Sequence, residues 1–582
     1  MHTRRQVLRG GLGLFALGAA GSAFGTASRA LGAQPDPHHL KKIPGLAEVP
    51  IKGSRPLAAR AFDPKPRMIG GFPIKNWYEG DDFNDGLNIP FHSDENVFPG
   101  GQPPEPTERV QVAVVGGGLS GLCSGYLLQQ YNPVVFELHP QFGGNAQGGV
   151  IDGSAYSLGS AYVITPDDGS TLDNIYRDLG LHDIVRVDEL PAPVEINGEI
   201  NDDIWSGVGA SPEEQPAYEA YRQLVIRMAE ETYPDVPFDE QWMLDLDRLS
   251  FKEHIEQEVG LAIPAALQAA IQAYCYASFC AGWEEISAAS GWNFLAAEEY
   301  GRWVFPGGNA WMADQMWQRI NATDATDAEH APHLRAGCRV VDVRVQADGL
   351  ALVTWRTPDG AFKSLLADRV IMATPKHVAR KILFGLEEED PEKFDAMVMF
   401  TRPYVVANVI LDRPVPDTFY DIFTLGDPDD YPKSAGEATE FWRFTDVTNG
   451  SFTPMSPVPG LPKTPGILTL YWPLSYDSAR FDLVLDDPIL AFGEALAEPL
   501  RRALTLIDIP EKAVQEVRFS RWGHAVPVAR VGFIADGMPG ILMRPYKDAV
   551  LFVNQDNWAL PAVENSLLDA VNAADAITKF LG

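Results

Sequence analysis

A glycine-rich stretch is the part of the sequence whose residue types and spacing most clearly suggest chemistry. Residues 116–121 read GGGLSG and fit the pattern G-x-G-x-x-G. Glycines at these positions permit a tight turn and let the backbone approach a pyrophosphate, whose negative charge then faces the N-terminus of a helix. We therefore predict that a dinucleotide binds here, in contact with Gly116, Gly118, Leu119, Ser120 and Gly121.

The elements on either side of this loop must hold it in place. A short valine-rich strand is predicted over residues 110–115, and apolar residues with helical spacing follow the glycines. A second apolar strand, residues 133–137, ends at Glu137, about 20 positions beyond the first glycine, where a carboxylate can accept hydrogen bonds from a ribose. Strand, turn, helix and acid together predict a Rossmann-like dinucleotide-binding domain.

The segment after this acid bears on which dinucleotide is bound. Residues 137–147 read ELHPQFGGNAQ and resemble the flavin amine oxidase superfamily, in which an acid is followed by Gly-Gly and a polar residue beside the cofactor. Further segments that resemble motifs of that superfamily are 152–160, 305–309, 367–375 and 550–556. The resemblance extends over about residues 108–582. Within the superfamily, the sequence most resembles the spermidine dehydrogenase-like branch.

The resemblance implies FAD as the cofactor and adds residues to its site. These are Gly143, Gly144, Asn145, Gly159, Ser160, Val341 and Asp556.

Three positions depart from the pattern of the superfamily. Asn145 stands where many relatives have Arg, residues 554–555 replace the usual Gly-Asp or Gly-Glu, and Asn408 lies in a strand where many relatives place a lysine by the flavin. These departures bear on the substrate more than on FAD.

The activity that the resemblance implies is oxidation of an amine by hydride transfer to flavin N5. Aromatic faces suit such a site, because they attract the incoming cation. Trp558, just after the C-terminal flavin segment, is our first candidate for an aromatic wall, and packing is its alternative role. His524 is a candidate proton acceptor, because histidine titrates near neutral pH, and a structural hydrogen-bonded role is the alternative.

Two further sets of side chains are candidates for a substrate tunnel. The aromatic set comprises Trp283, Trp292 and Trp303, whereas Tyr546 is a weaker candidate than Trp558 for the aromatic wall. The carboxylates that could bind a second ammonium group are Glu284, Glu285, Glu298 and Glu299. Core packing for the aromatic set and a solvated face for the acidic set remain open. The sequence holds no Cys-x-x-Cys-His haem motif and no G-x-S-x-G, so we expect no metal and no serine hydrolase chemistry.

Composition limits the classes of protein that the chain can be. The 582 residues carry 46 Lys and Arg against 79 Asp and Glu, a formal charge of −33, which argues against nucleic acid as a partner. Hydrophobic residues make up 46%, typical of a globular protein with a large core. Four cysteines are too few for a disulfide scaffold.

The first residues predict export from the cytoplasm. Arg4 and Arg5 precede a short Gly- and Ala-rich apolar stretch, and no acidic residue occurs before Asp36, a pattern that resembles a twin-arginine signal peptide. Cleavage after Ala30 or Ala33 fits equally well. We therefore expect a periplasmic or secreted protein, with a membrane anchor as the alternative.

We predict an α/β fold that combines a discontinuous FAD-binding Rossmann-like (GxGxxG) domain with a mixed α+β substrate domain. The expected cofactor-binding segments are 108–165, 300–385 and 515–582. The expected substrate-domain segments are 166–299, mainly helical, and 386–514, within which 412–466 is predicted as long loops. Residues 1–33 are the predicted signal, and residues 34–107 form an extended N-terminal arm rich in Pro, Gly and Asp.

Three functions remain open at this point. The first is an FAD-dependent amine oxidase or dehydrogenase, with a small amine or a polyamine as substrate and oxygen or a respiratory carrier as electron acceptor. A flavin desaturase or dehydrogenase of an apolar molecule is the second, and a non-catalytic flavoprotein subunit is the third. A cavity with carboxylates or an aromatic pair favours an amine, whereas an entirely apolar cavity favours the second function. A homo-oligomer is also possible.

Overall fold

The described part of the computed structural model covers residues 41–42, 55–59, 65–75, 79–81, 101–188, 190, 193–326, 333–438, 443–455 and 465–582. The predicted twin-arginine signal, residues 1–33, and much of the predicted arm lie outside these ranges. Within them, no helix combines the length and the apolar character that a membrane crossing requires.

The glycine-rich loop follows a central strand of an eight-stranded sheet. That strand, β6 (Pro106–Val115), is paired in parallel with β7 (Val134–Phe136) on one side and β18 (Phe362–Met372) on the other. The sheet continues through β17 (Ala351–Arg356) to β16 (Arg339–Val345), and β24 (Val550–Phe552) pairs in parallel with β18. The C-terminal halves of the parallel strands are buried, as expected for strands covered by helices on both faces.

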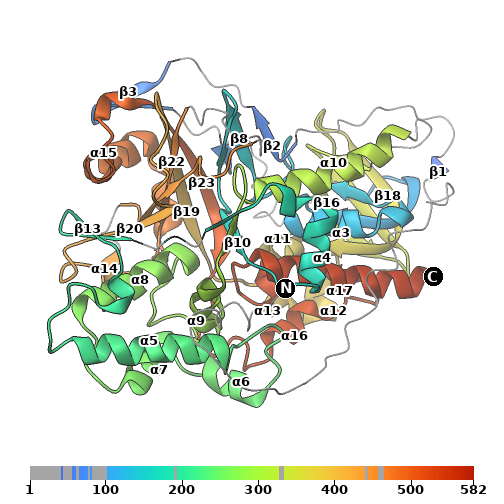
Figure 1. The fold of residues 1–582 in the computed structure, drawn as a ribbon. Coiled ribbons are helices and arrows are strands. Elements are labelled where there is room, and N and C mark those ends of the chain that lie inside the picture. Colours follow the sequence, from blue (N-terminus) through green and yellow to red (C-terminus); the bar gives the residue numbers. More distant parts are fainter. Residues whose placement is uncertain are drawn as a thin grey trace.

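Helices cover both faces of this sheet (Figure 1). On one face α3 (Leu119–Leu127), α10 (Ala310–Thr326) and α17 (Val563–Leu581) pack together over the strands. On the other face lie α11 (Lys376–Ile382) and α16 (Met538–Met543). Segments from three distant parts of the chain therefore build one domain, as the predicted discontinuous architecture requires.

A ten-stranded sheet forms the core of the second half of the molecule. Its centre is β19 (Thr401–Leu411), in which every residue is buried, flanked by antiparallel β22 (Ile467–Pro473) and β23 (Val514–Pro527). Beyond β22 the order continues through β21 (Asp446–Asn449) and β20 (Asp421–Gly426).

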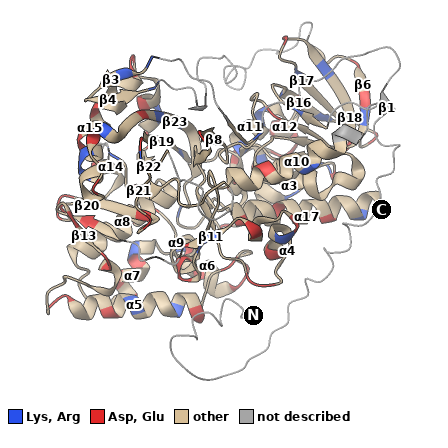
Figure 2. Cartoon of the chain, turned by 45° about the horizontal axis from the view of Figure 1, so that its top comes forward, with Lys and Arg blue, Asp and Glu red and all other residues tan. Residues whose placement is uncertain are grey.

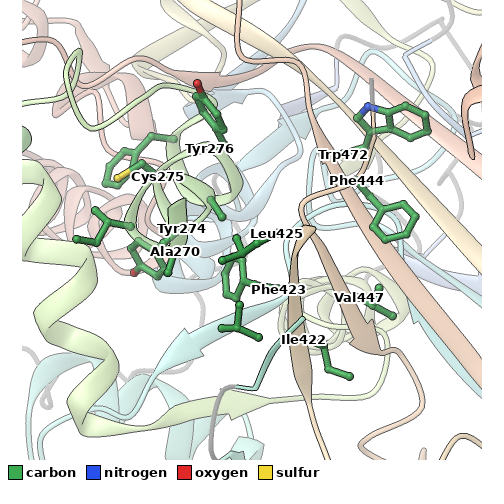
Figure 3. Close-up of a cluster of buried hydrophobic side chains, with 14 of the residues drawn as sticks. Ala270, Tyr274, Cys275, Tyr276, Ile422, Phe423, Leu425, Phe444, Val447 and Trp472 are labelled. Atoms are coloured by element: carbon green, nitrogen blue, oxygen red, sulfur yellow. The ribbon is translucent and has the colours of Figure 1, made fainter. Parts of the chain in front are cut away.

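Helices also surround the second sheet, in the left half of Figure 1. They are α5 (Gln215–Glu230), α7 (Phe251–Val259), α8 (Ala265–Phe279), α9 (Ala288–Leu295) and α15 (Pro488–Leu506). Figure 3 shows how α8 packs: Tyr274 and Tyr276 lie opposite Phe423 and Leu425 of β20, with Trp472 of β22 beyond them. This packing holds β20, which carries the acidic residue Asp421, in place.

The structure differs from the predicted organisation of the chain in three places. Strand β23 belongs to the ten-stranded sheet, so residues 514–527 join the substrate half rather than the last cofactor-binding segment. Residues 412–466, predicted as loops, contain β20 and β21. The predicted arm contributes short strands at Arg67–Ile69, Phe72–Ile74 and Glu79–Gly80 to the same sheet, because a long chain that lies over an open sheet edge satisfies its backbone by pairing there.

Candidate active site

The glycine loop forms a tight cradle between strand and helix. Gly116 adopts a φ of +111°, and a Cβ there would lie 2.6 Å from the carbonyl oxygen of Ala373. A Cβ on Gly121 would lie 1.8 Å from the Gly116 oxygen, so this glycine serves the close approach of helix to strand. A Cβ on Gly118 would meet no atom closer than 3.7 Å. Space is therefore left at Gly118, beside the N-terminus of α3, where a pyrophosphate fits.

Glu137 lies at the end of β7 and closes the cradle. Its carboxylate accepts hydrogen bonds from the backbone N–H of Gly117 and of His139, each at 2.8 Å. Burial raises the pKa of Glu137, while His139 and the two backbone donors oppose the rise. The carboxylate lines the cavity beside the loop, in the position where a ribose hydroxyl can donate to it.

A second loop meets the first from the other side. Gly143 and Gly144 both have positive φ, and the N–H of Gly143 donates to the carbonyl of Gly117 at 2.8 Å. The amide of Asn145 donates to the carbonyl of Ala525 on β23 at 3.0 Å. Asn145 thus links the dinucleotide-binding half to the ten-stranded sheet.

One cavity of about 1810 Å³ runs from this cradle into the seam between the two halves. The predicted cofactor and catalytic residues that line it are Gly116, Gly118, Leu119, Ser120, Glu137, Gly143, Gly144, Asn145, Gly159, Ser160, His524, Asp556 and Trp558. Of the predicted positions in the described chain, Gly121 and Val341 do not line it. Val340 lines it instead, because neighbouring residues of a strand face opposite ways.

An acidic chamber forms the part of this cavity beside β20 and β21. Arg302 lies at its centre and donates to Asp188 at 2.5 Å and to Asp421 at 3.2 Å. Glu298 lies 3.5 Å from Arg302, and the hydroxyl of Tyr162 donates to it at 2.7 Å. One arginine therefore faces several carboxyl groups.

Two aspartates of the chamber hold protons more tightly than usual. Burial raises the pKa of Asp421 to about 6, and Arg302 opposes the rise. Burial also raises the pKa of Asp446 well above its usual value, and the neighbouring Asp421 adds to the effect. Oδ1 of Asp421 is buried and has no hydrogen-bond partner in the described chain, although its residue lines the cavity. A buried acceptor of this kind suits a cationic or hydrogen-bond-donating ligand.

Aromatic side chains form other walls of the cavity. Tyr404 and Tyr471 pack edge to face with ring centroids 6.1 Å apart, and the hydroxyl of Tyr471 donates to the carbonyl of Gly159 at 3.0 Å. Trp558 packs against Phe238 at 6.0 Å, and its indole N–H donates to Asp569 at 3.3 Å. Trp558 therefore lines the cavity and is held by packing and a hydrogen bond.

Two histidines stack on the wall formed by α11 and β23. The rings of His377 and His524 lie 4.0 Å apart at an angle of 28°. Nδ1 of His524 lies 2.7 Å from the hydroxyl of Thr401 and 3.4 Å from a guanidinium nitrogen of Arg480. His377 was missed from the sequence, where the only available signal was its place just after the strand 367–375 that resembles a flavin-binding motif.

Several predicted candidates lie away from the cavity. Trp292 is fully buried and donates to His254 at 2.9 Å, and the side chain of Asn408 donates to the carbonyl of Ser157 at 2.8 Å. Of the predicted tunnel carboxylates, Glu298 lines the cavity. The positions singled out from the sequence that lie in the described ranges but do not line the cavity are Trp283, Trp292, Trp303, Tyr546, Glu284, Glu285, Glu299 and Asn408. In the same ranges no group of His, Cys, Asp or Glu is arranged to hold a metal ion.

Comparison with known proteins supports this description at the level of the fold. The family model of the NAD(P)-binding Rossmann-like domain matches residues 114–179. Putrescine oxidase in complex with putrescine has a TM-score of 0.53 and 16% identity, and cyclohexylamine oxidase from Brevibacterium oxydans IH-35A has a TM-score of 0.56 and 15% identity. Each match covers 81% of this chain and 99% of the other. The chain has the amine oxidase fold.

The same fold also occurs in a protein with a different kind of substrate, and the chain is related in sequence to a further oxidoreductase. A CLA-producing fatty acid isomerase from P. acnes matches with a TM-score of 0.53 and 16% identity over 81% of this chain and 99% of that chain. The oxidoreductase PigB of Serratia sp. (strain ATCC 39006) is 23% identical over 308 residues, which are 51% of this chain and 42% of that protein. The match thus spans less than half the length of PigB, and the fold by itself leaves the substrate open.

Proposed function

We propose that the chain is an FAD-dependent oxidoreductase that oxidises an amine, with a diamine or polyamine as the favoured substrate. The acidic chamber carries this proposal, because several carboxyl groups around one arginine offer a binding site for ammonium groups. It opens into the same cavity as the glycine cradle and Glu137. An entirely apolar cavity would have favoured an apolar substrate instead.

FAD fits the residues of the cradle. Gly118 leaves room for a pyrophosphate at the start of α3, and Glu137 presents a carboxylate to a ribose. The junction of Asn145 with Gly159 then lies further into the cavity, where the redox-active ring of the cofactor would be held. When bound, FAD supplies the acceptor for a hydride from the carbon beside the amine nitrogen.

The chain's own side chains bind and orient the amine. Glu298 and Asp421 attract a charged ammonium, and Tyr404 with Tyr471 presents aromatic surface to it. The buried walls exclude water and strengthen these electrostatic contacts. Oxygen or a respiratory carrier takes up the electrons afterwards.

We also propose that the protein is exported by the twin-arginine pathway to the periplasm or beyond. Arg4 and Arg5 ahead of a short apolar stretch support this proposal. A protein that is folded before export carries its cofactor with it, which agrees with the dinucleotide site of this chain.

An anaerobic titration of the purified holoprotein with mono-, di- and polyamines tests the function. We expect at least one amine to bleach the visible absorbance of the flavin. Asp421→Asn should raise the amine concentration needed for half-maximal reduction rate by about 10- to 100-fold, because a charge-assisted contact is lost. Glu284→Gln is the matched control, since Glu284 is a half-buried acid that does not line the cavity.

Two outcomes would contradict the proposal. A flavin that no amine reduces would point to an apolar substrate, as the shared fold of the fatty acid isomerase allows. Equal effects of Glu284→Gln and Asp421→Asn would show that the acidic chamber has no special part in amine binding.

A further inference from the structure

A second arm of the cavity reaches the surface beside the 3-10 helix η7 (Ala479–Val484). Phe481 and Val484 both line the cavity, yet they are 74% and 53% exposed. Leu485 and Leu490, which follow within ten residues, are 42% and 37% exposed. Single exposed apolar side chains are ordinary, but here two line a cavity and two more follow them within the next six residues of the chain.

The inner wall of this arm is polar. Thr401, His377, His524 and Arg480 line it. A guanidinium nitrogen of Arg480 donates to the carbonyl of Thr401 at 2.7 Å and lies 3.1 Å from its hydroxyl, which in turn lies 2.7 Å from Nδ1 of His524. The Thr401 hydroxyl accepts a hydrogen bond from Arg480 and therefore donates its own proton to Nδ1 of His524. Because Nδ1 accepts, the proton of the neutral imidazole lies on Nε2. The arm therefore combines hydrogen-bond donors within and apolar side chains at its opening.

This arm and the acidic chamber contact the cofactor junction through different residues. Asn145 bonds to the carbonyl of Ala525, next to His524, whereas Tyr471 of the acidic side bonds to the carbonyl of Gly159. Asn145 and Gly159 touch each other, because a Cβ on Gly159 would lie 2.4 Å from the Asn145 oxygen. Along β19 the five steps from Thr401 to Val406, which pairs with Tyr471, span roughly 16 Å.

We propose that this second arm binds a quinone, which takes electrons from the cofactor, while the amine binds in the acidic chamber. A quinone suits the arm because its carbonyl oxygens accept hydrogen bonds from Arg480 and His524, and its ring and tail pack on Phe481 and Val484. The inference rests on the proposed function in so far as a reduced flavin must be present to supply the electrons.

The redox step balances without another reactant. The reduced cofactor gives up two electrons and two protons, and the quinone takes up both to become a hydroquinone. The donors in the arm stabilise negative charge on the quinone oxygens as the electrons arrive.

The test uses holoprotein whose flavin is reduced with a stoichiometric amount of dithionite, so that no amine is involved. It is mixed anaerobically with a short-chain benzoquinone, and the return of flavin absorbance is followed. We expect Arg480→Leu to lower the second-order rate about tenfold through loss of a charged donor, and Phe481→Ser to lower it about fivefold through loss of ring contact. Equilibrium dialysis of the quinone against the oxidised holoprotein should show weaker binding in both variants.

Phe384→Ser is the matched control, because Phe384 is 57% exposed and does not line the cavity. We expect its rate and its quinone binding to equal those of the parent protein. Parent-like quinone binding and rates in both Arg480→Leu and Phe481→Ser would overturn the proposal. If the two variants lose quinone binding but no amine reduces the parent flavin, the second arm is supported and the amine function fails, so the two failures can be told apart.

Discussion

At the scale of single residues, two glycines of the same motif have different roles. A Cβ on Gly118 would meet no atom of the protein closer than 3.7 Å, whereas one on Gly121 would lie 1.8 Å from a backbone oxygen. We expect Gly118→Ala to fold normally but to lose FAD affinity, because the methyl group occupies space needed by the pyrophosphate. Gly121→Ala should lower the free energy of unfolding by about 1–3 kcal/mol, as overpacking does. Flavin content after dialysis and thermal unfolding of the apoprotein measure the two effects, and equal stability losses would contradict this division.

The residues that the sequence could reveal are those with a fixed spacing. Gly116 and Glu137 were predicted because backbone geometry dictates their separation, and the structure places both at the cavity. Asp421 and Asp446 were not predicted as site residues, because they come together only through the pairing of two short strands. Among the predicted acids, Glu298 lines the cavity and its neighbour Glu299 does not. The sequence of a short helical turn does not indicate which of two adjacent side chains faces inward.

At the scale of elements, long periodic segments were predictable and short strands were not. The sequence predicts a helix over residues 487–506 and, from its β-branched residues, a strand over 404–411, and these correspond to α15 and β19 within a few residues. Strands β20 and β21 lie in a region rich in Pro, Asp and Gly, which predicts loops, and they form because neighbouring strands and α8 bury them.

The pairing of β20 with β21 leads to a pH dependence. Burial raises the pKa of Asp421 to about 6, so its carboxylate loses charge as the pH falls through that value, while an aliphatic amine stays cationic. Amine affinity should therefore be full at pH 7 to 8 and should weaken below pH 6, by up to about tenfold per pH unit. The concentration dependence of anaerobic flavin reduction at pH 5 to 8 measures it. Asp421→Asn should flatten the profile, and a variant with the parent's pH dependence would assign the titration to another group.

At the scale of the whole molecule, the acidic surface should guide the substrate to the cavity. The formal charge is −33, and Figure 2 shows acidic residues on elements of both halves. Such a field raises the rate of encounter with cations, and salt screens it over a Debye length of about 10 Å at 0.1 M. We expect kcat/KM to fall as NaCl rises from about 0.02 to 0.3 M, with a slope about twice as steep for a diamine as for a monoamine, since the attraction scales with ligand charge. The rate at saturating amine should stay constant, because screening affects encounter rather than the bound state. Equal slopes for the two amines would mean that the local carboxyl groups, and not the charge of the whole molecule, control capture.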